Sequence, residues 1–128
     1  MASFRILLVL TTVLAYPLSL RAHHSLSAEF DLEKHMTVTG VVSGVEWMNP
    51  HVWIFMNVKD SASGKITRWA VQLPSPNMIY RFGWSREPFR PGLVVTVSAF
   101  PAKDGSRKGS AQQILSSGQK LFADSRAD

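Results

Sequence analysis

Histidine is the residue type in this chain best suited to hold a metal ion, and two of the four histidines are adjacent, at His23 and His24. If the chain is cut after Ala22, His23 gains a free α-amine, and that nitrogen and the ring Nδ1 can chelate one metal ion. A second imidazole, from His24, His35 or His51, would complete a planar set of three nitrogens. Nitrogen ligands in a near-square arrangement favour Cu(II), which also leads the divalent metals in affinity. The sequence therefore predicts a candidate copper site at His23, His24 and His51.

A cut one residue earlier would change the chelate but not the metal. The chain would then begin Ala22-His23-His24, and a histidine in third place offers Cu(II) the amine, two backbone amides and a ring nitrogen. Copper is therefore the metal to test for either cut. The alternative is that two histidines near a chain terminus bind no specific metal.

A second candidate site lies in the stretch EWMNPHVWIF, residues 46–55. Asn-Pro favours a turn, so this stretch connects two strands. In the second strand the side chains are expected to alternate between the two sides of the sheet. Val52, Ile54 and Met56 face the core, and His51, Trp53 and Phe55 face away from it. Aromatic faces suit sugars, flat ligands or the side chains of a partner protein. The candidate ligand or partner face consists of Trp47, Asn49, Trp53 and Phe55.

The alternative is that these aromatic side chains are packing residues. In that case the N-terminal residues or a short helix cover Trp53 and Phe55, Trp47 closes the end of a barrel, and His51 bonds to the loop.

Catalytic chemistry has weak support in the sequence. The carboxylates of Glu29, Asp31, Glu33 and Glu46 follow no spacing that would bring two of them together for acid–base work. The chain has no cysteine, no Gly-x-Ser-x-Gly and no glycine-rich phosphate loop. We therefore predict no catalytic residues, and a protein that binds rather than an enzyme.

Positive charge is modest and spread along the chain. Without Arg5 and Arg21, which lie in the first 22 residues, 12 basic side chains remain against 9 acidic ones, and the formal charge falls from +5 to +3. A nucleic-acid binder is expected to gather its positive charge on one face or element, so nucleic acid is excluded from the expected partners. The loop cations are expected to be solvated, with an anionic-ligand or membrane-surface patch as the alternative. They are Arg81, Arg86, Arg90, Lys103, Arg107 and Lys108.

The first 22 residues have the pattern of a cleavable secretory signal. Arg5 precedes an apolar run over residues 6–15, which is too short to span a bilayer, and Pro17 and a polar end at Ala22 follow it. Cleavage would leave residues 23–128 with no transmembrane segment. The protein is accordingly expected to be periplasmic or secreted in a bacterium, and its partner to be an envelope protein or a small ligand.

The elements that must position these residues are mostly strands. We expect a signal peptide over 1–22, a lead-in over 23–35, a barrel over 36–122 and a tail over 123–128. Three strands, a short helix near 77–82 and two further strands form the element order of an OB-fold, a five-stranded Greek-key barrel. A β-sandwich fragment or an open meander with a helix is the alternative. The strands are expected over 37–45, 52–59, 65–73, 93–100 and 111–115, with an edge extension over 120–122.

The mature chain resembles a family of small exported bacterial proteins of unknown function. The residues that carry the resemblance are His23-His24-Ser25, Glu29-Phe30-Asp31, Gly40-Val41-Val42, Trp47-Met48-Asn49-Pro50-His51, Gly83-Trp84 and Pro91-Gly92. The resemblance implies an envelope location and a β-barrel-like fold. It implies no activity, substrate or catalytic residue.

Overall fold

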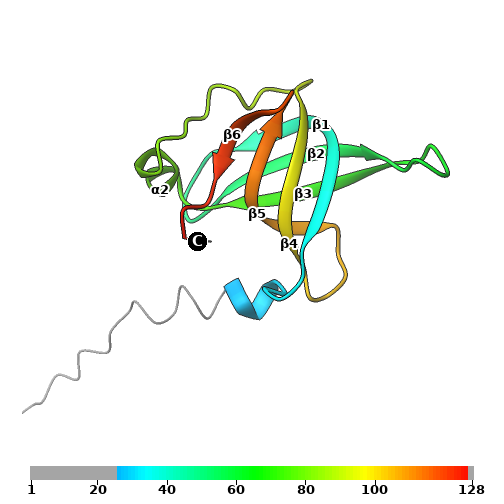
Figure 1. Cartoon of the computed structure of the whole chain (residues 1–128), viewed down its shortest axis with the longest axis horizontal. Helices are drawn as coiled ribbons and strands as arrows, with labels where there is room; N and C mark the ends of the chain where they lie inside the picture. The colour runs from blue at the N-terminus through cyan, green and yellow to red at the C-terminus, as the bar shows by residue number, and fades with distance from the viewer. Residues whose placement is uncertain (1–25, 127–128) are drawn as a thin grey trace, which may run out of the picture.

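The computed structural model describes residues 26–126, whose strands form one curved sheet beside a short helix (Figure 1). The helix is short because Pro76 opens it, the Ser75 hydroxyl caps it by accepting a bond from the Met78 backbone N–H at 3.4 Å, and Gly83 follows it in the left-handed region. In chain order the elements are β1 (Met36–Glu46), β2 (Val52–Lys59), β3 (Ile66–Leu73), α2 (Pro76–Arg81), β4 (Val94–Pro101), β5 (Lys108–Ser116) and β6 (Gln119–Ala123).

The sheet closes into a barrel. Its strand order is β3-β2-β1-β4-β5-β6, and a parallel pairing of β3 with β5 joins the two sides of the sheet. Strands β1 to β5 form the closed ring, and β6 extends it as an antiparallel neighbour of β5. The predicted OB-fold-like barrel with one helix between its third and fourth strands is confirmed.

Strand β1 holds the barrel together because it pairs with two neighbours. Its first half pairs with β4 as far as Val41, and its second half pairs with β2 from Val41 onward. Gly40 is buried at this changeover, where an added Cβ would lie 2.5 Å from the backbone oxygen of Asn57. The register also shifts between Val42 and Gly44. Both features allow this strand to bend between its two neighbours.

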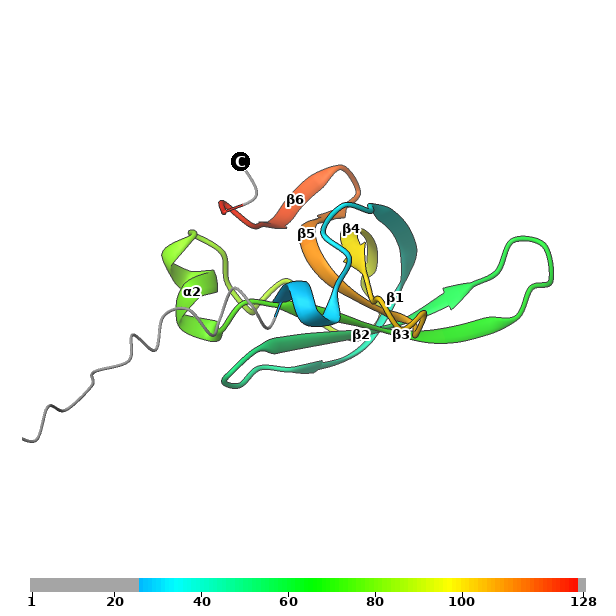
Figure 2. The same cartoon turned by 90° about the horizontal axis from the view of Figure 1, so that it is seen from below.

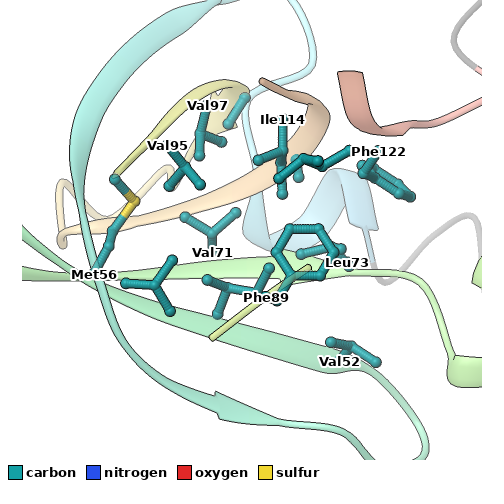
Figure 3. Packing of buried hydrophobic residues seen from close by; sticks show 14 of the residues in the cluster. Val52, Met56, Val71, Leu73, Phe89, Val95, Val97, Ile114 and Phe122 are labelled. Atoms are coloured by element: carbon teal, nitrogen blue, oxygen red, sulfur yellow. The ribbon is translucent and has the colours of Figure 1, made fainter. Parts of the chain in front are cut away.

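The core fills the inside of the barrel, as the side chains in Figure 3 show. On β2 the expected alternation holds, because Val52, Ile54 and Met56 are fully buried while the residues between them are not. Phe89 reaches the same core from the loop before β4. The surface that remains for ligands is therefore the outer side of the strands and the ends of the barrel.

Two segments differ from the expectation. Strand β5 begins at Lys108, three residues before the predicted start, because its first residues pair through their backbone with β3, and side-chain patterns do not reveal such pairing. The lead-in forms a helical turn over residues 26–29, followed by Phe30, which is fully buried and forms a bridge with Ala102. An ion pair between Glu29 and Lys108 joins this turn to the start of β5, and Figures 1 and 2 show the β2–β3 hairpin projecting from the barrel. The described residues contain no helix with the length and apolarity needed to cross a membrane.

Candidate functional site

The outer side of β2 and β3 carries two large aromatic side chains. Trp53 and Phe55 are half-buried, and they alternate with the core residues of β2. The guanidinium of Arg68 on β3 lies over the Phe55 ring, 4.6 Å from its centre. In the register of the sheet Trp53 stands between Glu46 of β1 and Gln72 of β3. We call these five residues, Glu46, Trp53, Phe55, Arg68 and Gln72, the aromatic face.

Gln72 is the most buried polar residue of the aromatic face. Its side chain is 6% exposed, and its Oε1 has no hydrogen-bond partner among the described residues. A buried acceptor left without a donor costs about 1–3 kcal/mol. Sequence reasoning missed Gln72 and Arg68. The predicted hairpin of residues 52–59 and 65–73 could have indicated both residues. In its register Gln72 lies opposite Trp53, and Arg68 lies opposite Asn57.

Trp47 and Asn49 do not belong to this face. Trp47 packs against the core, and its ring centre lies 6.0 Å from that of Tyr80 on α2. It follows the outward-facing Glu46 and turns to the end of the barrel, as the packing alternative proposed. Its buried Nε1 has no partner among the described residues. Asn49 is exposed in the turn, where its peptide bond to Pro50 is cis.

His51 is half-buried between segments that are distant in the sequence. Burial lowers the pKa of its ring, the Glu29 carboxylate partly offsets this, and the Arg126 guanidinium lowers the pKa further. The ring is therefore neutral at pH 7, the state that binds metals.

The other predicted metal ligands are not brought to His51 within the described residues. His23 and His24 lie outside the described part of the chain. His35 lies elsewhere, with its Nδ1 2.9 Å from Oε1 of Gln112 and its ring against Phe100. Residues 26–126 contain no group of three or more His, Cys, Asp or Glu side chains that could hold a metal ion.

Two of the four carboxylates considered for acid–base work are engaged with lysines. Glu29 pairs with Lys108 at 2.8 Å, and Asp31 pairs with Lys34 at 3.4 Å. Glu33 and Glu46 are exposed. Lys108 was predicted as a loop cation but belongs to β5. Its ion pair with Glu29 joins the lead-in turn to the barrel.

Solved structures of one yeast protein share this fold. The mitochondrial single-stranded DNA-binding protein Rim1 from S. cerevisiae aligns in one crystal structure with a TM-score of 0.50, at 14% identity, over 71% of this chain and 96% of that chain. Its selenomethionine-labelled crystal gives a TM-score of 0.49 at 14% identity, over 70% and 96%. At this identity the likeness shows the fold alone. A search of curated proteins found no match to the chain.

The comparison corrects one prediction. Nucleic acid was excluded as a partner because positive charge is scattered along the sequence, and that exclusion is wrong, because Rim1, which shares this fold, is a single-stranded DNA-binding protein. The physical reason is that binding of single strands relies on aromatic stacking as well as on charge.

Comparison of the sequence with family models shows which protein family it is related to. One model, described as a family of unknown function, matches residues 12–112, which is most of the chain. The expected membership of a family without an assigned function is thereby confirmed. The chain belongs to this family of unknown function, DUF6152.

Proposed function

We propose that this protein is an exported binding domain that holds a partner protein of the bacterial cell envelope against its aromatic face. The observation that carries the proposal is the outward position of Trp53 and Phe55 on a closed barrel whose core is already filled by other side chains. Export rests on the signal-like pattern of residues 1–22. The barrel supplies a rigid support, and the face supplies the contacts.

The composition of the face suits a protein partner. Tryptophan and arginine are enriched among the residues that dominate binding energy at protein interfaces. Here Trp53 is flanked by the carboxylate-bearing Glu46, and Arg68 already covers one side of the Phe55 ring. A surface of mixed charge with one ring partly covered favours polypeptide side chains over a row of stacked bases.

The test is site-specific photo-crosslinking in a bacterium that expresses the full chain. The crosslinking amino acid replaces Asn57, which is exposed beyond Phe55 on the outer side of β2. The matched control replaces Thr37, which is exposed on β1 and paired with β4. We expect one discrete protein adduct from position 57 and none from position 37. Its yield should fall at least about tenfold with Trp53→Ala, since truncating a central tryptophan commonly costs 2 kcal/mol or more.

Two outcomes would contradict this proposal. Equal adducts from positions 57 and 37, or an adduct unchanged by Trp53→Ala, would remove the aromatic face from partner binding. A single-stranded oligothymidylate is measured with the same purified protein by tryptophan fluorescence. If it binds and Trp53→Ala abolishes that binding, the face is assigned to nucleic acid instead.

Copper binding is a second candidate function, favoured by the position of the lead-in turn. The charge of Glu29 acts on His51, and His24 precedes Glu29 by five residues. Five extended residues span at most about 17 Å, which sets the largest separation between His24 and Glu29. The exported chain would then hold Cu(II) through the His23 amine and ring, with His24 or His51 completing the set.

Copper binding is tested on protein with a verified His23 terminus. We expect Cu(II) to bind more tightly than micromolar in calorimetry, and His51→Ala to change the EPR spectrum. His35→Ala serves as the control, because that ring is engaged with Gln112 and Phe100. Micromolar or weaker affinity, or a spectrum unaffected by His51→Ala, would rule out a built site that includes His51.

A further inference from the structure

A groove of 460 Å³ lies beside the loop between α2 and β4, and its lining contains no residue of the aromatic face. It runs between Val45 of β1 and the loop that leads from α2 to β4. The lining combines apolar and cationic side chains, because Val45, Phe89 and Pro91 are apolar while Arg86 and Arg90 are cationic. The groove is lined by Val45, Arg86, Glu87, Phe89, Arg90 and Pro91.

The loop that carries the two arginines is held firmly. Phe89 is 4% exposed and is part of the core. Its backbone N–H donates to the Arg86 carbonyl at 3.0 Å, and the Leu93 N–H donates to the Arg90 carbonyl at 3.1 Å. The Gly92 N–H bonds to the Val42 carbonyl of β1 at 2.8 Å. Because the backbone is anchored on both sides of the arginines, little ordering is needed when a ligand binds.

The arginines have free hydrogen-bonding capacity. Within residues 26–126 the ion pairs involve other residues, so Arg86 and Arg90 meet no carboxylate there. Nε of Arg90 donates to the backbone carbonyl of Glu87 at 3.2 Å, which orients that guanidinium. A guanidinium has five N–H donors in a planar fork that matches a carboxylate. Glu87 contributes one opposing charge, and the groove therefore keeps a net positive charge.

The strand beside the groove has a free edge. The hydrogen-bonded pairing of β1 with β4 ends at Val41 and Val94. Beyond that pair, the loop before β4 forms backbone hydrogen bonds with Val42 alone. From Ser43 to Glu46, β1 has a described strand neighbour on its β2 side alone. An extended peptide can add to such an edge through its backbone.

We infer that this groove binds the C-terminal residues of an extended polypeptide. The peptide backbone lies along β1 beyond Val42, and its terminal carboxylate accepts hydrogen bonds from Arg86 and Arg90. Its last side chain, which is apolar, contacts Val45 and Phe89. The anchored loop supplies the two charges, and the free edge of β1 supplies the backbone partners. Glu46 is the one residue of the aromatic face on this edge, and the proposed contacts do not involve Trp53 or Phe55.

The test measures fluorescence polarisation of a labelled peptide, Ser-Gly-Ser-Val-Val, with the full chain. The free acid is expected to bind, and the C-terminal amide to bind at least about tenfold more weakly, because a charge-assisted bidentate pair is lost. Arg86→Gln and Arg90→Gln are each expected to weaken binding of the free acid about tenfold. Glu87→Gln should strengthen it severalfold, because an opposing charge is removed. Arg81→Gln, which removes an exposed arginine of α2 outside the groove, should have no effect.

Several results would overturn the inference. Equal binding of acid and amide would show that no carboxylate is recognised. An equal loss in Arg81→Gln would indicate general attraction to a basic protein, and competition by acetate at equal molar concentration would indicate an anion site without a peptide. Arg90→Lys keeps the charge and removes the fork, so wild-type affinity in that variant would exclude the bidentate contact. Thermal melting of each variant confirms that it is folded.

Discussion

Gly40→Ala is expected to lower the free energy of unfolding by about 1–3 kcal/mol, the usual range for adding a methyl group to a filled site. The added Cβ would lie 2.5 Å from the backbone oxygen of Asn57 and 2.9 Å from Cε of Met56. The methionine side chain can move, but the carbonyl belongs to the β1–β2 ladder. The cost should therefore fall in the upper part of that range, as measured by urea denaturation.

Gly44→Ala is the matched control on the same strand. There the nearest heavy atom to an added Cβ is Cδ2 of Phe55 at 3.9 Å, an ordinary van der Waals contact. Neither Gly40 nor Gly44 has a positive φ, so the backbone conformation suits alanine at both positions. Since alanine also restricts the unfolded chain, Gly44→Ala should be neutral or stabilising by up to about 1 kcal/mol. Equal destabilisation by the two substitutions would contradict the close approach of β1 and β2 at Gly40.

Ile54→Ala is expected to destabilise the protein by about 2–5 kcal/mol, the range for truncating a fully buried aliphatic side chain. Trp53→Ala, one residue away, should cost only about 1 kcal/mol, because complete burial of a large apolar side chain contributes about 1.5–3 kcal/mol and Trp53 is only half-buried. Partner binding should show the reverse order. Crosslinking from position 57 should survive Ile54→Ala in the folded fraction and fail in Trp53→Ala.

Ile54→Val keeps this comparison informative if the alanine variant unfolds. It removes one methylene and is expected to cost about 0.5–1.5 kcal/mol. Urea denaturation gives the stability of each variant, and crosslinking yield per folded molecule gives the binding. If Trp53→Ala proved as destabilising as Ile54→Ala, Trp53 would be a packing residue, and the aromatic face would lose its role in the proposed function.

The two surfaces occupy different parts of one barrel. The aromatic face lies on the outer side of β2 and β3, and the groove of Arg86 and Arg90 lies along the free edge of β1. If both bind, the domain joins two polypeptides. Because no residue that lines the groove belongs to the aromatic face, Trp53→Ala and Arg86→Gln should have separate effects, and each proposal can fail without the other.

The element order and the core of β2 were predictable because they depend on local patterns. Alternating apolar residues placed Val52, Ile54 and Met56 inside, and a serine cap, a proline and a glycine marked the short helix. The outward side of Trp53 and Phe55 followed from the same alternation. Trp47 was assigned to that face by proximity in sequence, and its position beneath α2 depends on how the helix packs on the barrel end.

The sequence alone determined the strands, the helix and the side of β2 that faces outward, since each depends on neighbours along the chain. Only the tertiary structure decided which distant residues meet. The parallel pairing of β3 with β5 is made by backbone groups, which leave no side-chain pattern. Closure of the barrel sets Gln72 beside β5 and brings Glu29 to Lys108, while the anchored loop holds Arg86 and Arg90 along β1. Contacts between residues so far apart in sequence are fixed by packing and by closure, and therefore could not be read from local spacing.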